Sequence, residues 1–586
     1  MKSLSKSAVC LVAALMAGNA QVHPGFTLQS INFTPNNLFT PSQGGNRALP
    51  LVGDFDIFPD GRVAIAEWGV PGSVFIVSGL NTGANPAQVT RFAKGLDNVM
   101  GIAIANNTVY VMEKEALTQL VDANGDGTAD DYNSVNQAFP SDNSMLNFPY
   151  DMEYMNGSFY SAMSSDVHTG GYDWGSERWT PNTSLPGRST LYRLNLDGTS
   201  SAFACGFRNP NGMGVNGSDI FTSDNQGSWL PSSKVILVKQ GRFYGHQTLP
   251  ENPCQTTNND IESPPVVWNN WDNNETGRSS GNPIVLKQGR FAGQILVPDL
   301  VVGRQNPVFR VFVENIGGEL QGCILPFIKS GTQTGVHRIK EAANGNIYLG
   351  MLGSNGGWDF RSGMAPGFQL LRDNGTAVFE IKAVRSLGNQ NFELEFTKPV
   401  GTAAAQAGTY TVTKWRQIAA EAYGGGNNSN NTALTVQSAT VSSDRMKVNL
   451  QIGNLTAGWV VKFTFTGLAA QDGSSLFTHF AVYTLNRFGP GTDYQPAPTS
   501  VASRNGQDAE WKLIPEKGNY RLVFGEISPA PATVSVFDMR GSKVLATRLV
   551  QGPDFLLETD NLAKGLYHVR VQKGNGRTMS RRLLLP

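Results

Sequence analysis

The chain has 586 residues, more than a single compact core holds, so we expect about two to four domains. Glycine (65) and proline (31) are abundant and charged residues make up only 16%, which favours short strands and turns over helices. Lys plus Arg and Asp plus Glu are 46 each, so the zero net charge does not suggest nucleic acid as a partner.

The first 20 residues have the three parts of a secretory signal peptide. Two lysines precede a short apolar run at 8–16, and the small residues Gly18 and Ala20 precede a cleavage point before Gln21. A buried N-terminal helix is the alternative, but the complete pattern favours a signal that is removed. No later segment approaches the roughly 20 apolar residues of a membrane helix, so we expect no transmembrane segment.

The next part of the chain repeats one pattern, in which a turn rich in Gly, Asn or Asp joins two apolar, strand-like runs. Such hairpins, recurring with insertions, are typical of the blades of a β-propeller, and six copies predict six blades over residues 21–375. A pair of β-sandwiches with chance similarity is the alternative. The copies lie at 54–68, 100–113, 150–163, 211–224, 291–303 and 336–350.

A calcium loop is predicted between two strands, at 122–131. Its spacing D-x-N-x-D-G presents oxygen atoms to a hard cation, and Gly127 stands where such a loop turns sharply. Asn133 occupies the position at which a glutamate usually completes the ligand shell, so a solvated acidic turn is the alternative. The predicted ligands are Asp122, Asn124, Asp126 and Asp130.

Residues 204–229 place one cation, Arg208, among amides and small polar residues on the turns of a β-sheet. An Arg fork pairs with carboxylates and amides donate to oxygen atoms, so this pattern predicts a pocket for a polar, anionic small molecule. The alternative is turn chemistry, because Asn and Gly favour such loops. The candidate ligand-facing residues are Arg208, Asn209, Asn211, Asp224, Asn225 and Gln226, with His246 as a further candidate.

After residue 375 the sequence alternates apolar and polar residues at period two, which predicts a small β-sandwich at 376–488. Residues 489–508 have linker composition, and 509–586 are predicted to form a third β unit. With the signal removed, Cys205, Cys254 and Cys323 remain, and at most one pair of them can form a disulfide.

Several stretches resemble known families. The sequences "GFRNPNGMGVNGSDIFTSDNQGSW", "KVILVKQGRFYGH" and "GVHRIKEAANGNIYLGMLGSNGGW" are similar to the glucose/sorbosone dehydrogenase type of propeller. The stretch from "FELEFTKPV" to "FAVYTLNRF" resembles an Ig-like sandwich that trails such propellers. The tail "VSVFDMRGSKV…LAKGLYHVRV…RRLLLP" resembles the sorting domain of type IX secretion. The expected fold is all-β: a six-bladed propeller followed by two small Ig-like sandwiches.

The resemblance implies an oxidoreductase that binds pyrroloquinoline quinone (PQQ) and Ca²⁺ and oxidises a sugar. In quinone-binding relatives the residues matching Arg208 and Asn211 reach the cofactor. Relatives that oxidise sugars carry a catalytic His in the region aligned with "NFPYDMEYMNG", where this chain has none. A base is needed to remove the hydroxyl proton, and the candidates are His168 and Asp151.

Two further functions stay open. The missing His and the Trp- and Asn-rich insertion at 267–278 are compatible with a non-catalytic protein that binds carbohydrate. A Ca²⁺-dependent lactonase-like hydrolase is the weaker alternative. The expected partners are a small sugar or polysaccharide and the secretion machinery. The tail and the signal imply a location outside the cell or on the surface of a Gram-negative-type bacterium.

Overall fold

A computed structural model describes most of the chain, and the regular secondary-structure elements of its described residues are almost all β-strands. The exceptions among them are three short 3₁₀ helices, Leu80–Thr82, Thr402–Ala405 and Ala407–Thr409. The prediction of an all-β chain is confirmed, and no helix in this part is long and apolar enough to cross a membrane. The described residues are 21–39, 48–137, 139, 149–165, 187–227, 229–246, 264–269, 276–277, 279–300, 307–353, 366–388, 390–420, 424, 431–497, 511–516, 519–524, 532–538, 542–550, 554–573 and 578–585.

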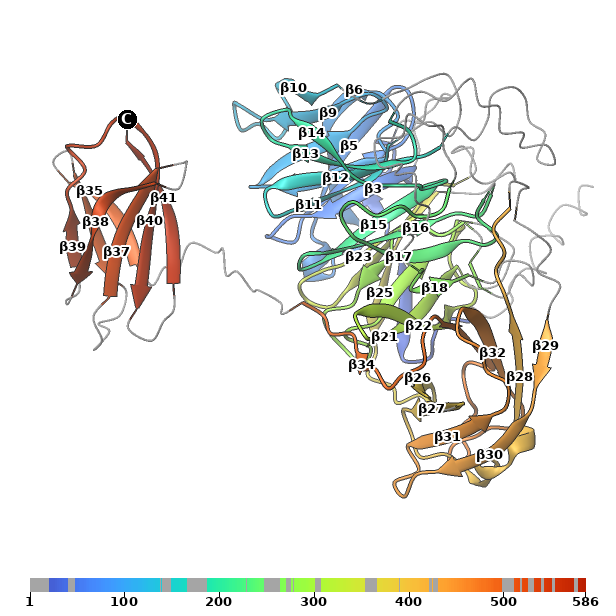
Figure 1. Ribbon diagram of the computed structural model, residues 1–586. Coiled ribbons are helices and arrows are strands. Elements are labelled where there is room, and N and C mark those ends of the chain that lie inside the picture. Colours follow the sequence, from blue (N-terminus) through green and yellow to red (C-terminus); the bar gives the residue numbers. More distant parts are fainter. Residues whose placement is uncertain are drawn as a thin grey trace, which may run out of the picture. The chain divides into compact units, whose positions relative to one another are not determined.

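The chain divides into two compact units, residues 1–499 and residues 500–586. In the first unit, the described residues form a ring of six antiparallel sheets, each of four main strands (Figure 1). The first three sheets contain β3 (Val52–Ile57), β4 (Val63–Glu67), β5 (Gly72–Ser78) and β6 (Ala87–Leu96), then β7 (Gly101–Ala105), β8 (Thr108–Met112), β9 (Leu117–Val121) and β10 (Asp131–Asn136), then β11 (Pro149–Met155), β12 (Ser158–Met163), β13 (Thr190–Asn195) and β14 (Ser200–Cys205).

The remaining three sheets continue in chain order, and the last one takes its fourth strand from the N-terminal segment. There β1 pairs with β25, so that Phe26 lies opposite Asp373 and Ser30 opposite Gln369. These sheets contain β15 (Pro210–Asn216), β16 (Asp219–Asp224), β17 (Lys234–Val238) and β18 (Val267–Trp268), then β19 (Ile284–Val285), β20 (Ile295–Pro298), β21 (Val308–Ile316) and β22 (Glu319–Ile328), then β23 (Arg338–Glu341), β24 (Ile347–Met351), β25 (Gly367–Asp373) and β1 (Phe26–Ser30).

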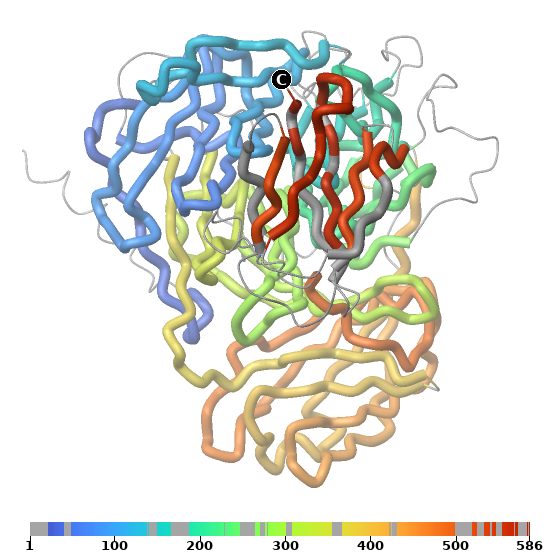
Figure 2. Tube along the Cα trace, turned by 90° about the vertical axis from the view of Figure 1, so that its left-hand side faces the viewer, coloured from blue at the N-terminus to red at the C-terminus, as the bar shows by residue number. Residues whose placement is uncertain are grey.

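The first strand of each sheet lies on the inside of the ring. β3 contacts β7, and the series continues through β11, β15, β19 and β23, which returns to β3. Figure 2 shows the sheets succeeding one another in chain order, from blue through green to yellow. This closed ring is a β-propeller. A short strand, β2 (Phe33–Thr34), adds to the outer edge of the first sheet by pairing parallel to β6.

The hairpins that the sequence predicted form because their turn residues accept a left-handed backbone. Asn106 and Asn107 join β7 to β8 with φ of 51° and 64°, and Asn156 and Gly157 join β11 to β12 with φ of 52° and 87°. Two-residue turns with both φ positive match the twist of antiparallel strands, and Asn and Gly reach these values at low cost. Apolar side chains between neighbouring sheets then form the cores of the ring.

The sandwich is joined to the fifth sheet of the ring by strand pairing. β22 pairs with β33, with Cys323 opposite Tyr483, so one sheet runs from the ring into the sandwich. Phe312, Cys323 and Leu325 accordingly belong to the sandwich core. This shared sheet continues with β33 (Phe480–Leu485), β32 (Trp459–Phe465), β28 (Tyr410–Trp415) and β29 (Thr432–Leu434), while β34 (Thr492–Asp493) pairs with β21, and the opposing sheet contains β26 (Ile381–Gly388), β27 (Asn391–Phe396), β31 (Lys447–Ile452) and β30 (Val436–Val441).

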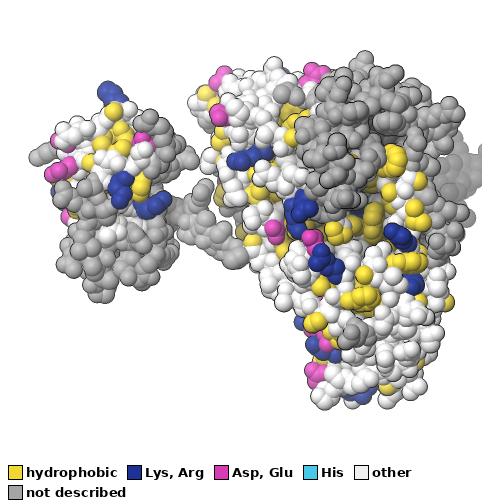
Figure 3. All heavy atoms as spheres, in the orientation of Figure 1, with side chains coloured by type: hydrophobic (Ala, Val, Ile, Leu, Met, Phe, Trp, Pro, Cys, Tyr) yellow, Lys and Arg dark blue, Asp and Glu magenta, His cyan; other side chains and the backbone are white. Residues whose placement is uncertain are grey.

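The second unit has two small sheets around its own apolar core, which includes Leu522, Val536 and Val569. On the face of the described residues in Figure 3, charged side chains of both signs are interspersed, in line with the balanced composition. One sheet of this unit contains β35 (Trp511–Glu516), β36 (Asn519–Phe524) and β39 (Asp554–Leu557), and the other contains β38 (Lys543–Val550), β37 (Ala532–Asp538), β40 (Gly565–Lys573) and β41 (Thr578–Leu585).

Candidate functional site

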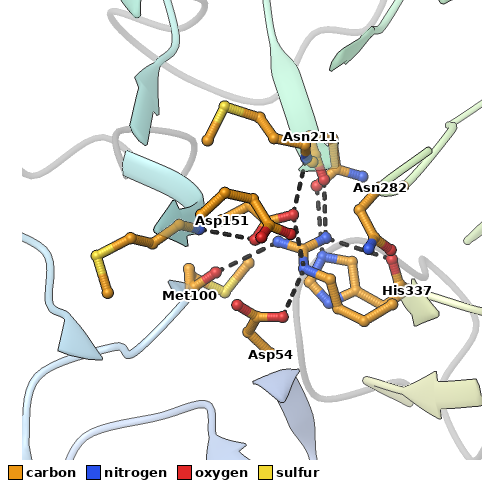
Figure 4. A network of polar contacts seen from close by, with 12 residues as sticks. Asp54, Met100, Asp151, Asn211, Asn282 and His337 are labelled. Carbon is orange, nitrogen blue, oxygen red and sulfur yellow. Dashed lines mark hydrogen bonds and ion pairs between the residues drawn. The ribbon is translucent and has the colours of Figure 1, made fainter. Parts of the chain in front are cut away.

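Polar groups from every sheet of the ring meet on its axis and form what we call the axial network (Figure 4). Register shifts occur in the inner strands between Val52 and Asp54, Tyr150 and Glu153, and Pro210 and Gly212. Such bulges re-aim side chains, here at the axis. The axial network consists of Asp54, Met100, Asp151, Asn211, Asn282, His337 and Arg338.

Arg338 is the centre of the axial network and is completely buried. Its guanidinium donates to the backbone oxygens of Asn211 (2.8 Å) and Met100 (3.3 Å). Its Nε lies 3.4 Å from Oδ1 of Asp54 and 3.7 Å from Oδ2 of Asp151. A buried cation requires such partners, because losing its water without compensation costs several kcal/mol or more.

The two carboxylates of the axial network also tie neighbouring sheets together. Oδ2 of Asp54 accepts a hydrogen bond from the N–H of Ile102 at 2.8 Å, and Oδ2 of Asp151 accepts one from the N–H of Met213 at 2.8 Å. Asn282 makes an equivalent bond, because its Oδ1 accepts a hydrogen bond from the N–H of Ile339 at 2.8 Å. These bonds cross-link sheet pairs one–two, three–four and five–six.

The other three junctions of the ring are closed by bonds to backbone oxygens. The N–H of Asp151 donates to Met100 (2.9 Å), and Nδ2 of Asn211 donates to Ser280 (3.1 Å). Nδ1 of His337 lies 3.2 Å from the oxygen of Val52. Burial and the charge of Arg338 lower the pKa of His337 well below its ordinary value, so the imidazole of His337 is neutral. The axial network therefore connects all six pairs of neighbouring sheets by hydrogen bonds or close polar contacts.

Asp151, a predicted base, thus lies in the axial network. Its backbone φ of 62° is unusual for a residue other than glycine, which indicates a backbone position held by its surroundings. Oδ1 accepts from the N–H of Met152 (2.7 Å), and Oδ2 is engaged by Met213 and Arg338. Burial, and then the neighbouring Asp151, raise the pKa of Asp54 well above its ordinary range. The role of Asp151 in catalysis stays a prediction.

The second polar cluster, which we call the rim site, is formed by Arg208, Asn209, Asp224, Asn225, Gln226 and His246. The first five lie where the chain reaches β15 and leaves β16, and His246 follows β17 (Lys234–Val238) and donates its N–H to the oxygen of Gly206 at 2.9 Å. Asp224 holds the turn, because its carboxylate accepts from the N–H groups of Asn209 (2.7 Å) and Arg208 (3.1 Å). Ser165 of the neighbouring sheet donates its N–H and its hydroxyl to the oxygen of Arg208, both at 2.8 Å. The backbone beneath the Arg208 side chain is thereby fixed.

Three side chains of the rim site combine the properties that an anionic, hydrogen-bonding ligand requires. Arg208, Asn209 and His246 are each 5% exposed or less. Oδ1 of Asn209 and Nδ1 of His246 are buried without a hydrogen-bond partner, which is uncommon for buried polar atoms. Burial, followed by the positive charge of Arg208, lowers the pKa of His246 to about 3. His246 is therefore a neutral ring that can bind a ligand but cannot take up a proton near pH 7.

Asn225 and Gln226 bond to the framework around the rim site. Oδ1 of Asn225 accepts from the N–H of Ser280 (2.9 Å) in the adjoining sheet, and Oε1 of Gln226 accepts from the hydroxyl of Ser233 (2.6 Å). Burial raises the pKa of Asp224, while the charge of Lys234 opposes that rise. The structure thus separates the predicted residues: Asn211 and Asp151 lie in the axial network, and the other candidate ligand-facing residues lie in the rim site.

Sequence reasoning missed Asp54 and Arg338 of the axial network, and Tyr150, which lies near both clusters. Tyr150 is buried beside an apolar cluster of Leu51, Trp68, Met100, Leu300 and Leu352, and burial raises its pKa well above the ordinary value. Arg208 and Arg188 oppose this rise through their charges, which places both near the phenol. Neither Asp54 in "VGDFDI" nor Arg338 in "HRIK" carried a clear signal, because each has a second residue of the same charge two positions further along the chain.

The predicted calcium loop folds as a compact turn. Oδ1 and Oδ2 of Asp122 accept from the N–H groups of Gly125 (2.7 Å) and Gly127 (2.9 Å), and Oδ2 of Asp130 accepts from Ala123 (2.8 Å). Among the described residues, no group of three Asp, Glu, His or Cys side chains is arranged to hold a metal ion. Calcium binding by Asp122, Asn124, Asp126 and Asp130 stays a prediction.

Other predicted features fall partly or wholly outside the described residues. His168 and Cys254 lie outside them, as do 270–275 and 278 of the Trp- and Asn-rich insertion. Cys205 is disulfide-bonded, whereas Cys323 is a free, buried thiol.

Comparison with solved structures finds matches at low sequence identity and with TM-scores below 0.5. A glucose dehydrogenase-type oxidoreductase from Thermus thermophilus is 14% identical, with a TM-score of 0.42 over 59% of this chain and 100% of that chain. The PQQ domain of pyranose dehydrogenase from Coprinopsis cinerea is 13% identical, with a TM-score of 0.41 over 60% and 97%. A luciferin-regenerating enzyme is 10% identical, with a TM-score of 0.37 over 60% and 96%.

No curated protein matches the sequence. One region does match a protein family, and it lies in the second unit. Residues 515–585 match the family described as the secretion system C-terminal sorting domain, which indicates that the chain is secreted or placed at the cell surface.

Proposed function

We propose that the propeller binds an anionic quinone of the PQQ type at the rim site and serves as an exported sugar or aldose dehydrogenase. The observation that carries this proposal is the buried Arg208 in one cluster with Oδ1 of Asn209 and Nδ1 of His246, two buried polar atoms without partners. A ligand whose carboxylates pair with the guanidinium, and which has an N–H or O–H donor for Oδ1 of Asn209 and a polar atom for Nδ1 of His246, would satisfy all three groups. The resemblance of the rim sequence to quinone-binding propellers supports the choice of ligand.

The residues present fit such a group. PQQ carries three carboxylates and a quinone, and a guanidinium fork pairs with a carboxylate in two parallel hydrogen bonds. Arg208 would hold one carboxylate, while the amide of Asn209 and the neutral ring of His246 would bind further polar atoms. Asp224, Asn225 and Gln226 would support these three through the turns that they stabilise. When bound, the quinone supplies a two-electron acceptor.

The base that would remove the hydroxyl proton is assigned by elimination among the candidate residues. His246 is excluded as a base near pH 7 because its pKa is about 3. Asp151 is engaged by two backbone N–H groups and by Arg338, so its oxygens already have partners. His168 therefore remains our preferred candidate base.

Both described candidates, His246 and Asp151, are thereby set aside as the base, and this favours one second function. In that case the rim site binds its ligand without turnover, and the protein recognises a carbohydrate or another polar molecule at the cell surface. Calcium at Asp122, Asn124, Asp126 and Asp130 would be structural with either function, because the loop joins two strands of the second sheet.

The test is a titration of the purified, exported protein with PQQ in the presence of Ca²⁺, followed by absorbance. Charge-assisted hydrogen bonds contribute about 1.5–3 kcal/mol each, so Arg208→Ala should weaken binding about 10- to 150-fold. Arg62→Ala is the matched control, because Arg62 is a partly exposed arginine paired with Asp60 on a turn between β3 and β4. It should bind as the wild type does.

Dye reduction with a series of aldoses then separates the two functions. Binding with turnover supports the dehydrogenase, and binding without turnover supports the non-catalytic protein. No binding of PQQ by the wild type, or equal binding by Arg208→Ala, would reject the proposal.

A further inference from the structure

The segment that follows β28 leaves the sandwich and returns to the rim site. Figure 1 shows this orange stretch running from β28 toward β16. The oxygen of Ala420 accepts a hydrogen bond from the N–H of Trp229 at 2.7 Å, and the N–H of Gly424 donates to the oxygen of Gly227 at 3.2 Å. Two residues of the sandwich segment therefore bond to a turn that directly follows the rim residues 224–226.

That turn, which we call the 227–230 turn, needs support from outside. Gly227 and Leu230 exchange two backbone hydrogen bonds, of 3.0 and 3.1 Å. Trp229 between them has a φ of 66°, a left-handed conformation that is costly for a bulky aromatic residue. Its backbone N–H is the group that Ala420 binds, so the sandwich segment holds the strained residue in place.

The backbone of the 227–230 turn is also the surface against which the Arg208 side chain packs. A side-chain carbon built on Gly227 would overlap Nε and Cζ of Arg208. The guanidinium thus lies directly against the backbone of Gly227, and no larger residue leaves it room. A shift of this backbone would move the charged group of the rim site.

We propose that Ala420 and Gly424 of the sandwich position Arg208 through the 227–230 turn, so that the sandwich is a working part of the propeller's binding site. The effect on ligand binding rests on the proposed function, whereas the structural link between the sandwich segment and Arg208 does not. Ala420 and Gly424 act as positioning residues: they bind the turn, and the turn sets where the guanidinium lies. The class of ligand is the one assigned to Arg208, an anion with planar carboxylates.

The test uses Gly424→Pro in the full-length protein, because proline removes the N–H that donates to Gly227 and cannot adopt the φ of 77° at this position. Gly458→Pro is the matched control: Gly458 has a φ of 80° and also donates one backbone hydrogen bond, to Leu485 at 2.7 Å inside the sandwich. Hydrogen exchange is measured on peptides covering 204–232 without ligand. We expect faster exchange in this region for Gly424→Pro and unchanged exchange for Gly458→Pro.

The second readout is the affinity for PQQ, expected to fall about tenfold in Gly424→Pro and to stay within about twofold in Gly458→Pro. Gly227→Ala tests the packing surface itself, keeps every backbone hydrogen bond, and should lower the affinity at least as much as Gly424→Pro. Unchanged exchange at 204–232 in Gly424→Pro overturns the structural link. If the wild type binds no PQQ while exchange rises as expected, the proposed function fails and the link stands. If PQQ binds but Gly227→Ala has no effect, the link to Arg208 is wrong.

Discussion

At the scale of single residues, the molecule buries two guanidinium groups in different surroundings. Arg338 and Arg208 are both buried guanidinium groups, but Arg338 connects sheets of the ring at its axis, whereas Arg208 lies in the rim site near His246. In the structure Arg208 and Asn209 lie together on the turn before β15. The sequence could not separate Asn211 from them, because a one-residue bulge at β15 decides which side chain faces the axis.

The axial network gives the first stability prediction. Arg338→Ala leaves Asp54 and Asp151 buried without their cation and should lower the free energy of unfolding by about 3–5 kcal/mol. The exposed pair of Arg62 and Asp60 should contribute less than about 1 kcal/mol, so Arg62→Ala is the control. Calorimetric unfolding of both variants checks the difference, and equal stabilities would contradict the assigned role of Arg338.

The decrease in the free energy of unfolding caused by Arg338→Ala should depend on pH. The pKa of Asp54 is already raised by burial, and without Arg338 it should rise further. A carboxyl with a higher pKa in the folded than in the unfolded chain binds more protons when folded, so stability falls as the pH rises through that interval. The variant should therefore be closer to the wild type near about pH 5 than near about pH 8. A constant difference at both values would argue against a charged Asp54 as the cause.

His246 gives a prediction of opposite sign. Its pKa is about 3 in the folded chain and 6.5 ordinarily, so between these values the unfolded chain binds more protons. Stability should therefore rise with pH from about 3 to 6.5 and gain nothing more from this residue above that range. His246→Gln should reduce the slope in this interval by up to one proton, as measured by unfolding at several pH values. An unchanged slope would mean that the ring is not buried in its neutral form.

At the scale of secondary structure, the periodic pattern predicted the inner hairpins well. The first four predicted copies and the sixth coincide with the first two strands of five different sheets. The fifth, at 291–303, covers only β20, because β19 is two residues long and lies upstream at Ile284–Val285. The pairing of β22 with β33 left no signal in the sequence. Pairing between strands some 160 residues apart depends on tertiary packing, which local pattern does not encode.

That pairing predicts how the chain tolerates truncation. A fragment ending at residue 375, the predicted end of the propeller, would leave β22 paired with β21 on one side only and would expose Phe312, Cys323 and Leu325. Bare apolar edges of this kind promote aggregation. We expect residues 21–375 to be insoluble and residues 21–499 to fold, as checked by soluble yield and size-exclusion chromatography. A soluble, monomeric 21–375 fragment would show that the shared sheet is dispensable.

At the scale of the whole molecule, folding and delivery reside in different units. Residues 500–586 have their own core and contain the sorting-domain match, while the ring and sandwich form the other unit. The tail was predictable from sequence because a short family pattern covers it. The path of the sandwich segment to the rim site was not predictable, because it depends on how the propeller and the sandwich pack together, which the local pattern of neither region encodes.

Deletion of residues 509–586 should therefore change location without changing the fold. We expect the truncated protein to melt at the temperature of the ring-and-sandwich transition in the full-length chain, and to stay in the periplasm. Calorimetry and cell fractionation measure the two effects separately. Normal surface display of the truncated protein would contradict the role assigned to the tail.

The free cysteine in β22 has a practical consequence. Burial raises the pKa of the Cys323 thiol, and its strand partner is Tyr483 of the sandwich. Because only an accessible thiolate is alkylated rapidly, a reagent such as iodoacetamide should modify this sulfur only when the two strands part. The protein thus contains a natural reporter, and the rate at which the label enters measures how often ring and sandwich separate in the native state.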